Sequence, residues 1–239
     1  MDKKSNVPKI VEMVFDAAYL VTVITLGIIL LLRAKTPVVF LFGAMATELG
    51  LGDAFHLVPR ILTAATGDRP RFLKMLSRGK MITSITMTVF YVLLWHAGLL
   101  LFSLNIPVWT AAVYVLAVIR IILCLAPGND WAQESESLKG SILRNIPFFL
   151  MGVMVIVLFA MQAAAMQAAG GPAAVRQAAV MQTAGGPAAV RFMWLAVLLS
   201  FAFYLPVVLW SRKVPKLGML MLPKTCAYVW IVAMGFGLL

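Results

Sequence analysis

Residues 48–60 combine several ionisable side chains with an apolar setting. They read Glu-Leu-Gly-Leu-Gly-Asp-Ala-Phe-His-Leu-Val-Pro-Arg, and the segment from residue 38 to residue 65 is otherwise apolar. Charged side chains at the depth of lipid hydrocarbon are costly, so they face protein or water and mark binding sites, proton relays or ion pairs. This stretch is therefore the first candidate for a functional site.

The spacing of these side chains allows them to line one cavity. On a helix, Asp53 and His56 lie about 60° apart, and Glu48 lies about 80° from His56. Tyr91 and His96, on the apolar segment that follows, are expected at similar depths. Carboxylates and histidines build proton relays in membranes, and histidine changes charge near neutral pH. We predict that Glu48, Asp53, His56, Tyr91 and His96 bind a solute or protons.

Three further charged residues are predicted to hold helices together. Asp16, Arg60 and Arg120 fall at similar depths of three different apolar segments, and an unpaired arginine there would be very costly. We expect an ion pair or triad among them, which Glu12 could join. This cluster is interpreted as structural.

A proline also disturbs the candidate site. Pro59 cannot donate a hydrogen bond to the carbonyl of Phe55, which lies beside His56. A carbonyl left open at this depth needs a partner or water. We therefore predict that the kink and the charged face share one wet pocket.

No metal or cofactor is predicted. His56 and His96 with a carboxylate would be a zinc-like set, but the two histidines are offset by ~12 Å along the helix axes. The chain has no glycine-rich nucleotide motif and no Gly-x-Ser-x-Gly sequence. Lys224 lies at the edge of the last apolar segment rather than in its middle, which argues against retinal. Cys124 and Cys226 lie in apolar runs and are interpreted as packing residues.

Composition identifies the elements that position these residues. The chain has 239 residues, of which 62% are hydrophobic and 12% charged, and a mean hydropathy of +0.97, values typical of an integral membrane protein. A spanning helix needs about 20 apolar residues. An all-α bundle of seven membrane spans is predicted, in a single domain, at about 10–33, 38–65, 80–104, 107–126, 146–168, 190–211 and 219–239.

The distribution of cations predicts the topology. With a cytoplasmic N-terminus, fourteen lysines and arginines lie in or beside inner loops and four lie outside, so the C-terminus is predicted to be external. The net charge of +11 therefore reflects membrane topology rather than nucleic-acid binding. A basic loop over residues 66–80 should attract anionic lipid headgroups on the cytoplasmic side. We expect a multi-pass protein of a bacterial plasma membrane.

Two patterns concern the arrangement of the spans. Residues 166–191 contain a tandem fifteen-residue repeat rich in Ala and Gly-Gly-Pro, which we predict to be an external loop. Pro59 and Pro206 lie at similar places in the second and sixth spans. This similarity suggests two three-helix repeats joined by the fourth span, a 3+1+3 plan found in transporters.

Three functions are compatible with the sequence. The first is a transporter-like protein that binds a small polar or cationic solute, with protons as coupling ions. The second is a hydrolase that acts on a lipid at the cytoplasmic leaflet, with Asp53 and His56 as catalytic acid–base groups and Arg60 holding a phosphate. The third is a non-catalytic sensor or scaffold. A cavity that touches both Asp53 and His56 would favour one of the first two.

Overall fold

The chain folds into a bundle of long helices. The computed structural model describes residues 7–127, 129, 131, 138–169, 186–211 and 213–239. In these ranges 90% of the structure is helical and no strand is present. Seven helices are long and apolar enough to cross a membrane. The prediction of an all-α, multi-pass membrane protein with seven spans is therefore confirmed.

The helices follow the apolar segments closely, with some extensions. Helices satisfy all their backbone hydrogen bonds internally, which hydrocarbon requires of a spanning segment. The α-helices are α1 (Val7–Arg33), α2 (Pro37–Thr66), α3 (Arg69–Leu101), α4 (Pro107–Leu125), α5 (Leu138–Ala169), α7 (Met193–Trp210) and α8 (Met221–Met234). Short 3-10 helices are η2 (Gly186–Val190), η3 (Pro215–Leu220) and η4 (Gly235–Leu238).

The turn between α2 and α3 is shorter than the sequence suggested. Gly67, with φ of 73°, ends α2, and the carboxylate of Asp68 accepts a hydrogen bond of 3.2 Å from the backbone N–H of Arg71. Pro70 in the first turn of α3 also favours helix initiation there. The expected basic loop over residues 66–80 is thus wrong for most of its length, because Arg69 to Lys80 form the first turns of α3.

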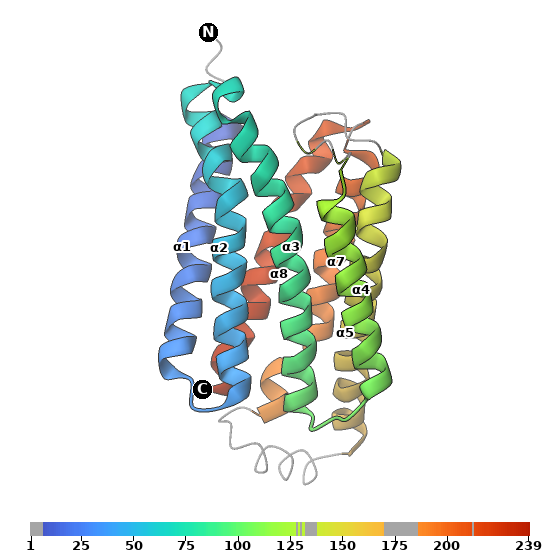
Figure 1. Cartoon of the computed structure of the whole chain (residues 1–239). Coiled ribbons are helices and arrows are strands. Elements are labelled where there is room, and N and C mark those ends of the chain that lie inside the picture. The colour runs from blue at the N-terminus through green and yellow to red at the C-terminus, as the bar shows by residue number, and fades with distance from the viewer. Residues whose placement is uncertain (1–6, 128, 130, 132–137, 170–185, 212) are drawn as a thin grey trace.

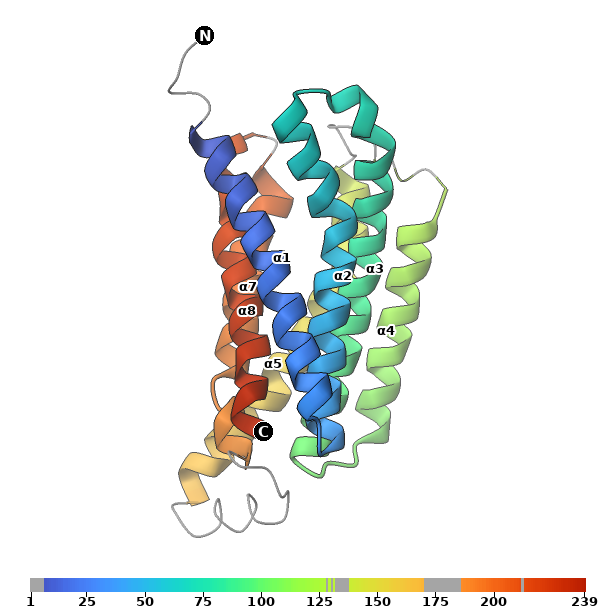
Figure 2. The ribbon, with the colours of Figure 1, turned by 90° about the vertical axis from the view of Figure 1, so that its left-hand side faces the viewer.

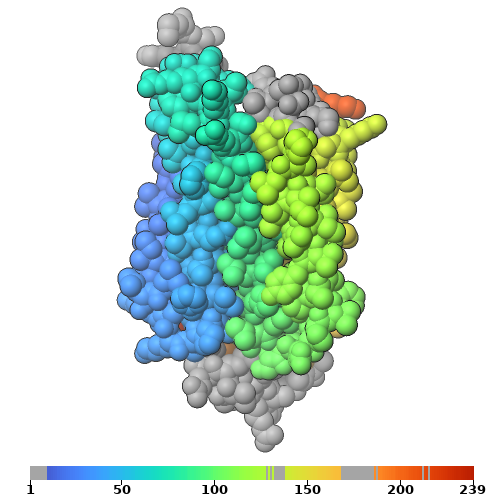
Figure 3. Space-filling view, in the orientation of Figure 1, coloured from blue at the N-terminus to red at the C-terminus, as the bar shows by residue number. Residues whose placement is uncertain are grey.

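The helices pack side by side along the bundle. Helix α2 packs extensively on α1 and α3, while α7 packs on α5 and α8. Helix α4 contacts α3 and α5, and α1 also contacts α8 (Figures 1 and 2). The beginning of α1 and the C-terminus lie at opposite ends of the bundle (Figure 2). Figure 3 shows α2, α3 and α4 side by side on one face. Helix α4 has many exposed apolar side chains, among them Val108 and Ile122.

The kink in α2 is covered by α3. A Cβ atom on Gly79 would collide with the carbonyl group of Phe55, whose oxygen Pro59 leaves without its helical partner. Because Gly79 has no side chain, the backbone of α3 can lie directly against this carbonyl. The Phe55 carbonyl therefore lies against the backbone of α3, while the predicted access of water to it stays a prediction.

The tandem repeat is only partly described. Residues 166–169 form the last turn of α5, and Gly186–Val190 form η2, in which Val190 is buried. The rest of the predicted external loop over 166–191 lies mainly outside the described residues.

Candidate functional site

A polar cavity of about 350 Å³ lies inside the bundle. Residues of α2, α3, α4, α5, α7 and α8 line it. It reaches the end of the bundle where the chain passes from α4 to α5 and from α7 to α8, because Trp131 and Ser211 on these connections contribute to its wall. This end is uppermost in Figure 1.

The wall of the cavity is rich in positive charge. Four cationic side chains contribute, namely Lys80 of α3, Arg120 of α4, Arg144 of α5 and Lys224 of α8. His56 of α2 lies within electrostatic range of both lysines. None of the described residues that line the cavity is an aspartate or a glutamate. The described lining of the cavity therefore carries a net positive charge.

Hydroxyl and amide groups complete the polar lining. Thr83, Ser84, Ser141, Asn145, Tyr204 and Ser211 all contribute to the wall. The Tyr204 hydroxyl donates a hydrogen bond of 2.9 Å to Oδ1 of Asn145, whose amide nitrogen donates to the carbonyl of Ser141 at 2.8 Å. These bonds fix the α5 and α7 sides of the cavity, while neutral donors and acceptors remain available beside the cations.

Arg120 is the most deeply buried of the four cations. Its exposed fraction is 3%, and its guanidinium lies 3.6 Å from the centre of the Phe148 ring. Within the described part of the chain, Nε and Nη1 have no hydrogen-bond partner. The structure thus places Arg120 in the cavity wall, and not with Asp16 and Arg60 as the sequence suggested. Helix α4 packs on α3 and α5, which leaves it on the other side of α3 from α1 and α2.

Arg144 is held by the segment that follows α4. The amide nitrogen of Asn129 donates to the carbonyls of Leu123 and Ala126 at 2.6 and 3.1 Å, and so caps the end of α4. Oδ1 of Asn129 accepts a hydrogen bond from Arg144, whose guanidinium lies 4.2 Å from the Trp131 ring centre. The end of α4 and the beginning of α5 are therefore tied together at the mouth of the cavity.

Aromatic side chains close the inner end of the cavity. The ring of Phe148 packs edge-on against Tyr91, with the ring centres 4.9 Å apart, and in a tilted arrangement against Phe201, with the ring centres 5.2 Å apart. Tyr91 is fully buried, and its hydroxyl lies 3.4 Å from those of Ser200 and Tyr228. The structure places Tyr91 behind the floor of the cavity rather than on its surface, where a solute-binding residue was expected.

Asp53 and His56 occupy different environments. His56 lines the cavity, and its buried Nδ1 has no hydrogen-bond partner among the described residues. Asp53 does not line the cavity, but accepts a hydrogen bond of 2.6 Å from the Tyr19 hydroxyl of α1. The structure thus separates the two residues: His56 lies in the cavity wall, and Asp53 is bonded to α1.

The expected outer pair of Glu48 and His96 is not formed. Nε2 of His96 lies 2.6 Å from the Tyr114 hydroxyl of α4. Both carboxylate oxygens of Glu48 are buried without a hydrogen-bond partner in the described part of the chain. Glu48 lies in a separate groove, away from the cationic cavity.

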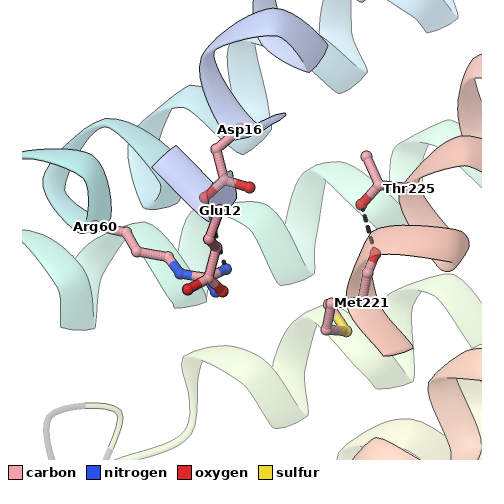
Figure 4. Close-up of polar contacts among 5 residues, drawn as sticks. All are labelled: Glu12, Asp16, Arg60, Met221 and Thr225. Carbon is pink, nitrogen blue, oxygen red and sulfur yellow. Dashed lines mark hydrogen bonds and ion pairs between the residues drawn. The ribbon is translucent and has the colours of Figure 1, made fainter. Parts of the chain in front are cut away.

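Arg60 joins α1 to α2 through two carboxylates. It forms an ion pair with Glu12, and its Nη1 lies 3.8 Å from Oδ2 of Asp16 (Figure 4). The structure therefore brings Asp16 and Arg60 together and adds Glu12. Because this cluster engages the Arg60 guanidinium, Arg60 is not placed to hold a phosphate in the cavity.

Several cavity residues were missed because they lie at the ends of predicted spans. Lys80, Arg144 and Lys224 were counted as topology signals only. A pattern in the sequence could have found the site, since α3, α5 and α7 with the residue that follows it each contribute four lining residues at positions i, i+3, i+4 and i+7. These stripes are 80, 83, 84 and 87 on α3, 141, 144, 145 and 148 on α5, and 204, 207, 208 and 211 on α7.

Comparison with known proteins does not assign the site. No family model matches the chain, and neither a curated protein nor a solved structure matches it. Among the described residues, no group of three or more histidine, cysteine, aspartate or glutamate side chains could hold a metal ion. The chemistry of the site must therefore be argued from its own side chains.

Proposed function

We propose that this protein is a membrane carrier for a small anionic solute that bears a phosphate or carboxylate group. The observation that carries the proposal is the cationic cavity, which is open at one end of the bundle and closed inside by Phe148 and Tyr91. A site inside the bundle that is reached from one side is what alternating access requires. The charge of the wall favours an anion over the cationic solute considered from the sequence.

The chemistry of the wall suits a compact oxyanion. Arginine offers a planar set of N–H donors to phosphate or carboxylate, and lysine adds a point charge. Lys80, Arg120 and Lys224 line the same cavity as His56, so an anion bound there can interact with several of these side chains at once. The volume of about 350 Å³ is near the lower limit of small-molecule sites. A metabolite-sized anion therefore fits better than a large one.

The packing of the helices supports a carrier. We propose the 3+1+3 plan, with α1, α2 and α3 as one unit, α5, α7 and α8 as the other, and α4 as the link. The cavity lies where these units meet. Relative motion of the two units could open it to the opposite side. We place the N-terminus in the cytoplasm of a bacterial cell, so that the cavity in this conformation faces the cytoplasm.

The basic beginning of α3 supports a contact with lipid headgroups. Arg71, Lys74 and Arg78 lie on the first turns of α3, at the same end of the bundle as the mouth of the cavity. We propose that they contact anionic headgroups of the cytoplasmic leaflet. Such headgroups would hold this end of α3 at the membrane surface.

Binding to purified protein in detergent tests the proposal. We expect inorganic phosphate, succinate or glycerol phosphate to raise the unfolding temperature in a saturable manner, because a ligand at 100 times its Kd stabilises a protein by about 2.7 kcal/mol. Lys224→Gln should abolish this effect. Lys216→Gln is the matched control, since Lys216 is exposed and does not line the cavity. An equal response of both variants would contradict the proposal.

Proteoliposomes distinguish a carrier from a binding protein. Uptake of the best-binding radiolabelled anion should be saturable and should depend on Lys224 but not on Lys216. Binding without uptake would exclude the carrier. The phosphate of a lipid headgroup has the same chemistry as a free phosphate ester, so vesicles that contain phosphatidic acid serve as a competitor in both assays.

An enzyme that acts on a phosphate-bearing lipid is the second candidate. The observation that favours it is the unpartnered Nδ1 of His56 in the wall, where it could exchange a proton with a bound group. Chromatographic detection of a lipid product that is lost in His56→Gln would support it. An unchanged lipid composition after incubation with the wild-type protein would argue against it.

A further inference from the structure

A second depression contains Glu48 and is separate from the cationic cavity. This groove of about 460 Å³ is lined by residues of α1, α2 and α3, and its wall is almost entirely apolar. Phe40, Leu51 and Phe55 form its rim with exposed fractions of 55%, 53% and 56%. Exposed apolar side chains on a spanning helix face lipid, so the groove opens toward hydrocarbon.

The carboxyl group of Glu48 is deeply placed and has no partner. Glu48 lies ~17 Å along α2 from Pro37, well inside the apolar part of the helix. Both of its oxygens are buried and accept no hydrogen bond from any described residue. No cation lines the groove among the described residues, and the sides toward α1 and α3 contribute Leu31 and Thr86, neither of which titrates.

The surroundings of Glu48 oppose its ionisation. A carboxylate without a partner in hydrocarbon costs several kcal/mol, and this cost disappears when the group carries a proton. Asp53, five residues later on α2, accepts a hydrogen bond of 2.6 Å from the Tyr19 hydroxyl, whereas Glu48 accepts none from a described residue. Glu48 is therefore the carboxyl group of α2 for which the protonated form is favoured.

We propose that Glu48 is a proton-binding carboxylic acid buried beneath a groove that opens to the lipid, separate from the cationic cavity. An acid that is reached through such a groove should react with a hydrophobic carbodiimide. The acid proton is transferred to a nitrogen of the N=C=N group while a carboxyl oxygen bonds to its central carbon. The O-acylisourea that forms then rearranges to a stable N-acylurea, and no atom is lost in either step.

The experiment uses the full chain in liposomes with dicyclohexylcarbodiimide at pH 7. We expect mass spectrometry of the digested protein to find the adduct on the peptide that contains Glu48. Glu48→Gln should lose the adduct, whereas Glu12→Gln, which removes the ion-paired partner of Arg60, should keep it. Because the adduct is located on the wild-type chain, the test does not depend on the folding of either variant.

Three results would overturn the proposal. Modification of Glu48 only below about pH 5 would identify an ordinary carboxylate that is charged at neutral pH. Equal modification by a water-soluble carbodiimide would show that Glu48 faces water. Absence of an adduct on Glu48 at every pH would show that the group is not reached from the lipid.

Discussion

At the scale of single residues, the cations of the cavity are held by different means. Arg120 stacks on Phe148, Arg144 is bonded to Asn129, and Lys224 lies 4.6 and 5.2 Å from the ring centres of Tyr204 and Tyr228. Contacts between a cation and an aromatic face stabilise the charge of Arg120 and Lys224 inside the bundle. The charge of these two side chains can therefore persist in the wall and interact with a bound anion.

Arg120→Lys should weaken anion binding although the charge is kept. A lysine cannot present the planar donor set of arginine and stacks less well on a ring. We expect a loss of affinity for inorganic phosphate of about tenfold, which corresponds to ~1.4 kcal/mol. Isothermal titration calorimetry measures the change, with Lys216→Arg as a control that should bind like the wild type. Unchanged affinity in Arg120→Lys would show that the guanidinium does not contact the anion.

The hydrogen bond between Tyr19 and Asp53 should contribute to stability. A double-mutant cycle of Tyr19→Phe and Asp53→Asn isolates it, and we expect a coupling of about 1–3 kcal/mol, because the bond of 2.6 Å is part-buried and its acceptor is a carboxyl oxygen. Chemical unfolding in mixed micelles gives the free energies. Additive effects of the two substitutions would indicate that the bond is not formed in the folded protein.

Residue types in the sequence identified only part of the candidate site. His56 was found because an ionisable group in an apolar run is conspicuous, and Asp16 and Arg60 were placed at a common depth for the same reason. The depth of a residue in a helix does not determine which faces of different helices meet. Arg120 was therefore predicted to pair with Asp16 and Arg60 but lies in the cavity wall. His96 was predicted to lie beside Glu48 but contacts Tyr114. Lys80 and Lys224 were missed because a cation at the end of a span also serves as a topology signal.

At the scale of the elements, the contact between α2 and α3 depends on one glycine. The backbone of Gly79 packs against the carbonyl that Pro59 leaves without its helical partner. The sequence predicts this open carbonyl from Pro59, but it does not predict which helix will cover it. The apolar segments of the sequence did locate the helices. Helix α3 begins before its apolar segment, at Arg69, because Asp68 caps its N-terminus.

Gly79→Ala should destabilise the protein. The added methyl group would collide with the Phe55 carbonyl and force α2 and α3 apart, and overpacking of this kind costs about 1–3 kcal/mol. Gly218→Ala is the matched control, since nothing lies within 4 Å of its Cβ position. The unfolding temperatures of the two variants in detergent, each compared with that of the wild type, measure the loss of stability. If Gly79→Ala is as stable as Gly218→Ala, the close contact between the helices is absent.

At the scale of the whole molecule, the described residues form seven helices that are long and apolar enough to cross a membrane. Composition and apolar length predicted the number of spans, because hydrocarbon imposes both on any spanning helix. The packing of the spans follows from side-chain fit between segments far apart in the chain. In the sequence, the suggestion of two groups of three helices rested on the similar positions of Pro59 and Pro206 in the second and sixth predicted spans.

Labelling of introduced cysteines should reveal the orientation. In a variant without Cys124 and Cys226, Lys35→Cys should react with a membrane-impermeant maleimide in intact cells, whereas Lys74→Cys should react only after the membrane is permeabilised. Both positions are exposed and lie at opposite ends of the bundle. The reverse pattern would mean that the cationic cavity opens to the outside of the cell.

The two-residue turn between α2 and α3 has a mechanical consequence. The turn reaches beyond the ends of the neighbouring helices at the top of Figure 1. Because α2 and α3 are tightly packed along their length, they form a lever whose tip at Gly67 lies ~16 Å along α2 from His56. A tilt of the pair by ~10° at the depth of His56 would displace the tip by ~3 Å. A spectroscopic probe at this tip can therefore report on events at the cavity without entering it.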